Sequence, residues 1–220
     1  MKAELRNKIN FYLFPPALML FTRAGIELSV AWIPSKSAWI SSFAIYYIFI
    51  LLIGDFARRK GLYNENTPGF NSPVIKPSFL HFLWGVLLPA VLPLYFFLNN
   101  IAGVPLDVLQ MIIIVALINP YFEEKFWRKL MSQMPVKNSF KIVYSAFWFS
   151  AGHYILWASY WLTEPRVWMP TVATTFIMGI CWMSFFLKTG KYRYIVISHM
   201  LVDIFNLSAA VFFGIELRTI

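Results

Sequence analysis

Long apolar runs dominate this chain and restrict the folds that it can adopt. Each run is close to the roughly 20 residues that an α-helix needs to cross the hydrocarbon layer of a membrane. The runs cover residues 11–33, 38–56, 79–99, 104–122, 145–162, 168–187 and 194–213. Hydrophobic residues make up 59% of the 220 residues and charged residues only 13%, more apolar surface than a soluble core of this size needs. We therefore predict an all-α, polytopic integral membrane protein with about seven transmembrane helices.

The basic residues predict how these helices are oriented. Most of the 19 Lys and Arg residues fall before the first run and after the second, fourth and sixth runs, which all lie on one side of the membrane. Cytoplasmic loops carry such an excess, so the N-terminus is expected in the cytoplasm and the protein in the cell membrane as a multi-pass protein. The net charge of +9 then reflects topology and contact with an anionic lipid bilayer, and nucleic acid is not an expected partner.

The rest of the chain predicts a single unit. No internal repeat and no segment long enough for a second domain interrupts the apolar runs, so residues 1–220 are expected to form one transmembrane domain. The single cysteine, Cys181, excludes an intramolecular disulfide and a metal cluster held by thiolates.

Ionisable residues on three of the runs indicate a polar site inside the membrane. They are Glu123, Glu124, Arg128, His153, His199 and Asp203. Such groups cost free energy in a membrane unless they meet partners or water, so they mark a functional site by default. With a helical rise of about 1.5 Å per residue, all of them fall in the cytoplasmic half of the membrane.

Helical spacing indicates which of these side chains point the same way. Residues four apart share a face of a helix. Three pairs have this spacing: Glu124 and Arg128, Phe149 and His153, and His199 and Asp203. The adjacent Glu123 and Glu124 diverge by about 100°. One of them can therefore face a central site while the other holds Arg128 or a neighbouring helix.

Each of these residues also has an ordinary structural explanation. Residues 123–129 are compatible with a charged turn at the membrane surface, and His153 with a buried histidine that bonds a backbone carbonyl. An ordinary structural role explains the pair His199 and Asp203 less well, because each of two ionisable groups deep in one apolar run costs free energy in the membrane. The agreement in depth between the three runs favours one common site.

Three short motifs occur in order along the second half of the chain. They are EEKFWR at 123–128, FSAGH at 149–153 and HMLVD at 199–203. They resemble the motifs of the CAAX protease and bacteriocin-processing family, also called the Abi family, which is related to the type II CAAX prenyl endopeptidases. The family pattern is Glu-Glu followed after three residues by Arg, then Phe with His four on, then His with Asn or Asp four on. The resemblance covers the region from about 104 to 213, the expected motif-bearing core.

This resemblance implies an intramembrane endopeptidase whose site faces the cytoplasm. Its substrate would be a membrane-associated peptide, such as a prenylated or lipidated protein or a leader peptide. By analogy with the family, Glu123 would activate water with the help of His153, and Glu124 and Arg128 would hold Glu123 in place.

The last motif would then stabilise the oxyanion through His199 and residue 203. Family members with Asn at this last position have an amide donor there, whereas an ionised Asp203 can only accept hydrogen bonds. Asp203 is therefore expected to orient His199 or to bind a metal.

Two chemistries and two further classes of function remain open at this point. Glu123, His153 and His199 could hold a divalent metal such as zinc, with water as the fourth ligand. The chain has no His-Glu-x-x-His helix, which favours a glutamate mechanism with no required cofactor. The other classes are an ion or proton relay and a catalytically silent membrane partner, such as an immunity protein of the same fold.

Overall fold

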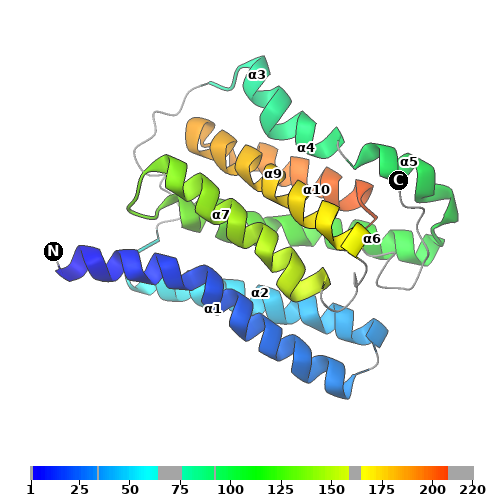
Figure 1. The fold of residues 1–220 in the computed structure, drawn as a ribbon, viewed down its shortest axis with the longest axis horizontal. Helices are drawn as coiled ribbons and strands as arrows, with labels where there is room; N and C mark the ends of the chain where they lie inside the picture. The colour runs from blue at the N-terminus through cyan, green and yellow to red at the C-terminus, as the bar shows by residue number, and fades with distance from the viewer. Residues whose placement is uncertain (1, 34, 64–75, 92, 159–164, 208–220) are drawn as a thin grey trace.

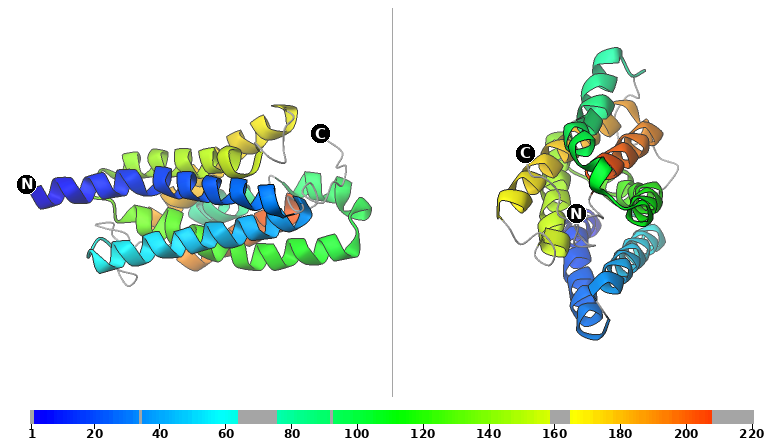
Figure 2. Two further views of the ribbon diagram at one scale, coloured as in Figure 1. Left: turned by 90° about the horizontal axis from the view of Figure 1, so that it is seen from below. Right: turned by 90° about the vertical axis from the view of Figure 1, so that its right-hand side faces the viewer.

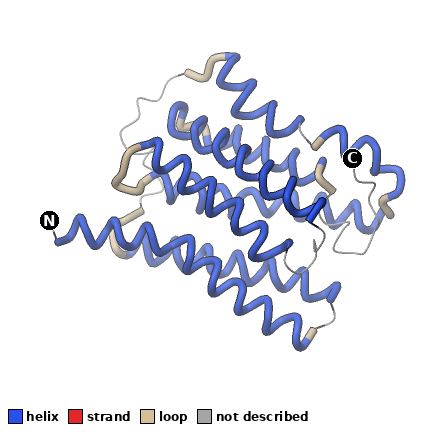
Figure 3. The backbone as a smooth tube through the Cα atoms, viewed as in Figure 1, coloured by secondary structure: helices blue, strands red, loops and turns tan. Residues whose placement is uncertain are grey.

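The computed structural model describes residues 2–33, 35–63, 76–91, 93–158 and 165–207. Every regular element in these residues is a helix, and none of them lies in a strand (Figure 3). In chain order the elements are α1 (Lys2–Trp32), α2 (Ser35–Arg59), α3 (Phe79–Phe82), η1 (Leu83–Leu87), α4 (Leu88–Val91), α5 (Leu94–Asn100), η2 (Ile101–Gly103), α6 (Leu106–Glu124), η3 (Lys125–Leu130), α7 (Asn138–Gly152), η4 (His153–Ala158), α9 (Pro165–Thr189) and α10 (Tyr192–Phe205). The elements η1, η3 and η4 are π-helical turns, and η2 is a 3₁₀ turn.

Over the residues that the structure describes, the apolar runs lie almost entirely in helix, which confirms the predicted all-α membrane fold. Five stretches of the described residues are long and apolar enough to cross a membrane: 7–32, 38–59, 79–103, 106–130 and 168–189. The fifth run lies in α7 and η4, and the seventh lies in α10. Over the residues described, these helices are not among the five candidate membrane spans. The ends of these two runs, 159–162 and 208–213, lie outside the described residues.

The helices form a bundle in which consecutive long helices run in opposite directions. Figure 1 shows α6, α7, α9 and α10 together in the centre, with α1 and α2 along one edge and α3 to α5 along the other. The most extensive helix contacts join α7 with α9, α1 with α2, and α6 with α10. In the turned views of Figure 2, α1 and α2 stay paired beside the central group. The site residues lie on α6, η3, η4 and α10.

Glycine allows α7 and α9 to approach closely. A Cβ atom added at Gly179 of α9 would lie 3.0 Å from the Cα of Ala146 on α7, tighter than ordinary van der Waals contact. Small residues at such crossings are typical of helix packing in membranes, where no water is expelled and close contact supplies the attraction.

Helix geometry changes at the positions that carry the candidate residues. Pro120 lies inside α6 and cannot donate a backbone hydrogen bond, and the π-helical turn η3 begins directly after Glu124. A second π-helical turn, η4, begins at His153. Such turns are rare and occur frequently at functional sites.

Candidate active site

The structure buries an ion pair between Glu124 and Arg128, at the end of α6 and in η3. Both side chains have 0% exposure, and Arg128 Nε lies 2.9 Å from Glu124 Oε2. The other carboxylate oxygen, Oε1, lies 2.8 Å from Nδ1 of His199 on α10. A carboxylate can only accept, so His199 donates from Nδ1. Glu124 therefore joins η3 to α10.

The second nitrogen of His199, Nε2, faces two further carboxylates. It lies 3.5 Å from Glu123 Oε2 and 3.4 Å from Asp203 Oδ1. These distances exceed the roughly 2.7–3.2 Å of a direct N–H···O hydrogen bond. His199 and Glu123 are both buried, and Asp203 is half-buried. Three carboxylates from two helices thus surround one imidazole ring.

Asn119 fixes the orientation of Asp203. Its Nδ2 donates to Asp203 Oδ2 at 3.0 Å, and its Oδ1 accepts from the Tyr47 hydroxyl at 3.2 Å. Asn119 lies one helical turn before Glu123 on α6. Both residues therefore face the same side of the helix, toward α10.

His153 approaches the cluster from η4. Its Nδ1 lies 2.8 Å from the carbonyl oxygen of Phe149, one turn earlier in α7. A carbonyl only accepts, so Nδ1 carries the proton and the neutral ring keeps a lone pair on Nε2. His153 contacts the cluster through the ring of Phe149, whose centre lies 4.7 Å from that of His153 and 5.9 Å from that of His199.

Phe149 and Trp182 enclose the charged groups in aromatic rings. The Arg128 guanidinium lies 4.8 Å from the ring centre of Phe149 and 5.4 Å from that of Trp182, within the range of cation–π attraction. His199 stacks on Trp182 with ring centres 4.6 Å apart. The rings keep water away from the ion pair, which strengthens electrostatic interactions inside it.

The spacing predictions for the site agree with this geometry. Each of the three pairs predicted to share a helix face makes a side-chain contact: the ion pair of Glu124 and Arg128, the ring contact of Phe149 and His153, and the 3.4 Å approach of His199 and Asp203. Glu123 and Glu124 take different partners, as expected for neighbours on a helix: Glu124 meets Arg128 and Nδ1 of His199, and Glu123 lies near Nε2 of the same ring. The predicted roles themselves concern the reaction and stay predictions.

The partners of Glu124 and His199 differ from those that the family resemblance implies. The resemblance places Glu124 and Arg128 against Glu123, whereas the structure places Glu124 against His199. Asp203 is expected to orient His199 or to bind a metal; its Oδ1 lies 3.4 Å from Nε2 of His199, while Glu124 holds the Nδ1 proton. The physical reason is that adjacent helical residues point about 100° apart, so Glu123 and Glu124 approach different nitrogens of the His199 ring.

Three polar residues of the site escape prediction from the motifs. They are Asn119, Tyr46 and Tyr47. Asn119 has a usable sequence signal, because it stands four residues before Glu123 and shares its face. The two tyrosines lie on α2, far from the motifs in sequence, and only tertiary packing brings them to the site.

A bound metal ion would need several donors that converge on one point. In the part of the chain that the structure describes, no three His, Cys, Asp or Glu side chains are arranged to hold a metal ion. His199 and His153 use their Nδ1 atoms on Glu124 and on a backbone carbonyl, so only their Nε2 atoms are open to another partner. Histidines that bind a metal through Nε2 commonly make such second bonds. A metal held by Glu123, His153 and His199 and a metal-free glutamate mechanism therefore both stay predictions.

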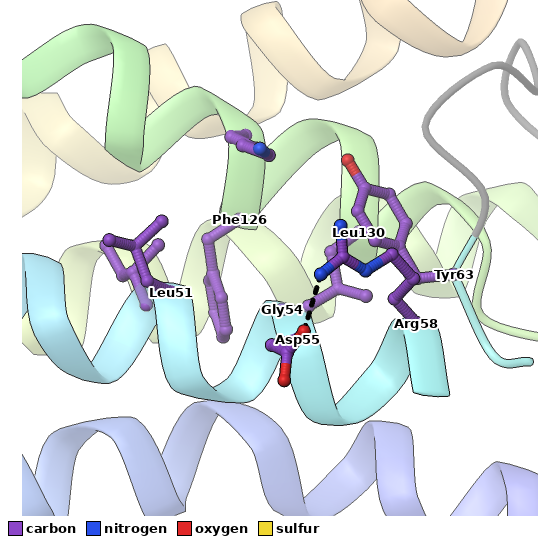
Figure 4. Close-up of a pocket in the computed structure, with 9 residues that line it drawn as sticks. Leu51, Gly54, Asp55, Arg58, Tyr63, Phe126 and Leu130 are labelled. Carbon is purple, nitrogen blue, oxygen red and sulfur yellow. Dashed lines mark hydrogen bonds and ion pairs between the residues drawn. The ribbon is translucent and has the colours of Figure 1, made fainter. Parts of the chain in front are cut away.

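A separate pocket of about 210 Å³ lies on the other side of η3, against α2 (Figure 4). Phe126 and Leu130 of η3 line it, while Arg128 of the same turn faces the cluster. Arg58 donates to Asp55 in the wall of the pocket. None of the six predicted site residues lines this pocket.

Residues 105–205 match one protein family, described as type II CAAX prenyl endopeptidase Rce1-like. The match contains all three motifs and lies within the expected core of residues 104–213. No curated protein and no solved structure matches the chain. Helices α1 to α5 lie outside the matched segment.

Proposed function

We propose that this chain, whose residues 105–205 carry an Rce1-like domain, is an intramembrane endopeptidase that uses Glu123 to activate water. The single observation that supports this most strongly is the meeting of Glu123, His199 and Asp203 from two helices in a buried, aromatic-lined place. Buried ionisable groups in a membrane are costly, so their convergence argues for a function that uses them.

Glu123 is the base in this proposal. Its carboxylate takes one proton from a water molecule, and the hydroxide oxygen forms a bond to the carbonyl carbon of the peptide. The free lone pair on Nε2 of His153 accepts a hydrogen bond from the same water and helps to orient it. No covalent intermediate with the protein is needed.

His199 stabilises the tetrahedral intermediate. When its ring carries both protons, Nδ1–H donates to Glu124 and Nε2–H is available to the oxyanion, between Glu123 and Asp203. Glu123 then passes its proton to the leaving nitrogen, and the C–N bond breaks to give a carboxylic acid and an amine. Transfer of the remaining acid proton to the amine leaves a carboxylate and an ammonium group. Asp203 keeps His199 aligned and is itself held by Asn119.

The substrate of this reaction is a membrane-associated peptide, such as a prenylated or lipidated C-terminal segment or a leader peptide. The site lies among helices that are apolar enough to span a membrane, which favours a substrate that is itself held in the bilayer. The excess of Lys and Arg on one side supports a site that faces the cytoplasm of a cell membrane.

Cleavage in ¹⁸O-labelled water tests the proposed reaction. The purified protein in detergent is incubated with a lipid-tethered peptide, and the products are identified by mass spectrometry. We expect a new carboxyl terminus that carries one ¹⁸O atom and a new free amine. If prenylated, otherwise lipidated and leader peptides all gave no products, the proposal would be contradicted.

A chelator separates the glutamate mechanism from a metal-dependent one. We expect the same rate of cleavage after treatment with EDTA and dialysis, because the proposed roles need only protein groups. A loss of cleavage that zinc restores would instead assign Glu123, His153 and His199 to a metal.

A further inference from the structure

Two adjacent tyrosines of α2 reach the site from outside the family-matched segment. Helix α2 packs against α6 and η3. Tyr46 is buried at 2% exposure, and Tyr47 is half-buried. Buried tyrosine hydroxyls usually bond to a partner. The partners of these two hydroxyls lead to Glu123 and to Asp203.

Tyr46 links η3 to Glu123. The indole Nε1 of Trp127 donates to the Tyr46 oxygen at 3.1 Å. An indole N–H can only donate, so the Tyr46 oxygen is the acceptor in this bond and its proton is available to another group. Trp127 stands four residues after Glu123, so this bond places the Tyr46 hydroxyl about one helical turn from Glu123, with which it interacts electrostatically. The proton left on Tyr46 is therefore available to the Glu123 carboxylate.

Tyr47 acts on Asp203 through Asn119. Its hydroxyl lies 3.2 Å from Asn119 Oδ1, and Asn119 Nδ2 lies 3.0 Å from Asp203 Oδ2. A carboxylate only accepts, so the amide must turn its nitrogen toward Asp203 and its oxygen toward Tyr47. The hydroxyl of Tyr47 thus fixes which way the amide of Asn119 faces.

The tyrosine rings are held by packing that does not involve their hydroxyls. Tyr47 stacks on Phe122 with ring centres 4.6 Å apart, and Tyr46 meets the edge of Trp157 at 6.1 Å. A change from tyrosine to phenylalanine keeps these ring contacts and removes only the hydroxyl. The hydroxyls can therefore be tested apart from the fold.

We propose that α2 completes the site, with Tyr46 as a positioning residue for Glu123 and Tyr47 as a positioning residue for Asp203. This inference rests on the proposed hydrolytic function. Neither tyrosine needs to touch the substrate. Each hydroxyl holds one carboxylate in the orientation that it needs to face His199 or the attacking water.

Steady-state kinetics on Tyr46→Phe and Tyr47→Phe test the positioning role. We expect kcat to fall about 10-fold in each variant, because Tyr46 acts on the alignment of Glu123 and Tyr47 acts through Asn119 on that of Asp203. KM should stay within about twofold, since uniform binding of the substrate is unaffected. Tyr144→Phe is the matched control, because its hydroxyl also bonds another helix, at Tyr12 O, away from the site. This control should keep the wild-type kcat.

Carbodiimide labelling supplies a readout that does not depend on cleavage. A hydrophobic carbodiimide modifies carboxyl groups in apolar surroundings, and peptide mass spectrometry locates the adduct. We expect faster modification of Glu123 in Tyr46→Phe than in wild type or Tyr144→Phe, because the hydroxyl no longer holds the carboxylate. Tyr47→Phe should speed modification of Asp203 in the same way.

The two readouts separate the possible failures. If the wild type cleaves peptide and the two variants match it in kcat, the positioning role is overturned. If the wild type cleaves no peptide, the proposed hydrolysis fails, and labelling alone decides whether the tyrosines hold the carboxylates. Labelling rates equal to those of Tyr144→Phe would then overturn the inference as well.

Discussion

Two ion pairs with the same spacing have opposite surroundings in this protein. Glu124 and Arg128 stand four residues apart, as do Asp55 and Arg59 at the end of α2. The first pair has 0% exposure on both side chains, whereas Arg59 is 78% exposed. Local spacing therefore creates both pairs, and the helices packed around them decide what each pair contributes.

The difference arises from what covers each helix end. Around Arg128, η3 packs against α7 and α9, and the rings of Phe149 and Trp182 close over the guanidinium. Asp55 instead divides its carboxylate between Arg58 and Arg59, which are both exposed. An exposed ion pair contributes little to folding stability because water and salt screen it. A buried ion pair also contributes little net stability, because both charges lose their hydration. Removing one partner of a buried pair is nevertheless strongly destabilising, because it leaves the other charge buried alone.

The largest expected effect follows from removing one partner of the buried pair. Arg128→Met leaves the Glu124 carboxylate buried without its cation, which should lower the free energy of unfolding by about 3–5 kcal/mol. The matched change Arg59→Met should cause no measurable loss. Unfolding of both variants by titration of a denaturing detergent, followed by tryptophan fluorescence, makes the comparison. Equal losses in the two variants would remove the distinction between the pairs.

A smaller effect is expected on activity when the charge of the carboxylate is removed. Glu124→Gln keeps the size of the side chain but weakens the hold on Nδ1 of His199, and a shift of this ring should lower kcat/KM about 100-fold. Asp55→Asn is the control on α2 and should keep wild-type kinetics. A wild-type kcat/KM for Glu124→Gln would show that this contact does not serve the reaction.

Helix packing offers a third comparison, with the smallest expected effect. Gly179→Ala should destabilise the protein by about 1–3 kcal/mol, because the added methyl group meets Ala146 at 3.0 Å. Gly54→Ala, in α2, meets no atom within 4 Å. It should be neutral or stabilising by up to about 1 kcal/mol, since alanine favours a helix. Thermal unfolding of both variants in the same detergent measures the difference. A lower unfolding temperature for Gly54→Ala than for Gly179→Ala would contradict this reasoning.

The sequence predicts local geometry well because local geometry depends on helical spacing. The apolar runs coincide with helices, and the pairs Glu124 with Arg128 and His199 with Asp203 meet as their spacing indicates. Arg23 and Glu27, also four apart, form the ion pair that this spacing predicts, at 2.8 Å.

Contacts between helices could not be predicted from spacing. The bond from His199 to Glu124 joins residues 75 positions apart, and that from Asn119 to Asp203 joins residues 84 apart. They depend on how α6 and α10 are rotated about their axes when they pack. The π-helical turns at η3 and η4 also shift the phase of side chains, which regular helical spacing does not anticipate. Tyr46 likewise reaches the site only through the packing of α2 against α6 and η3, so the motifs give no signal for it.

The most direct measurement compares the same substitution at two glutamates of membrane helices. Glu123 lies beside His199 in the buried cluster, whereas Glu27 pairs with Arg23 and is 58% exposed. We expect Glu123→Gln to abolish cleavage of a lipid-tethered peptide, because the amide cannot take a proton from water. Glu27→Gln should retain the wild-type kcat/KM. Cleavage by Glu123→Gln at the wild-type rate would contradict the assignment of the buried cluster as a hydrolytic site.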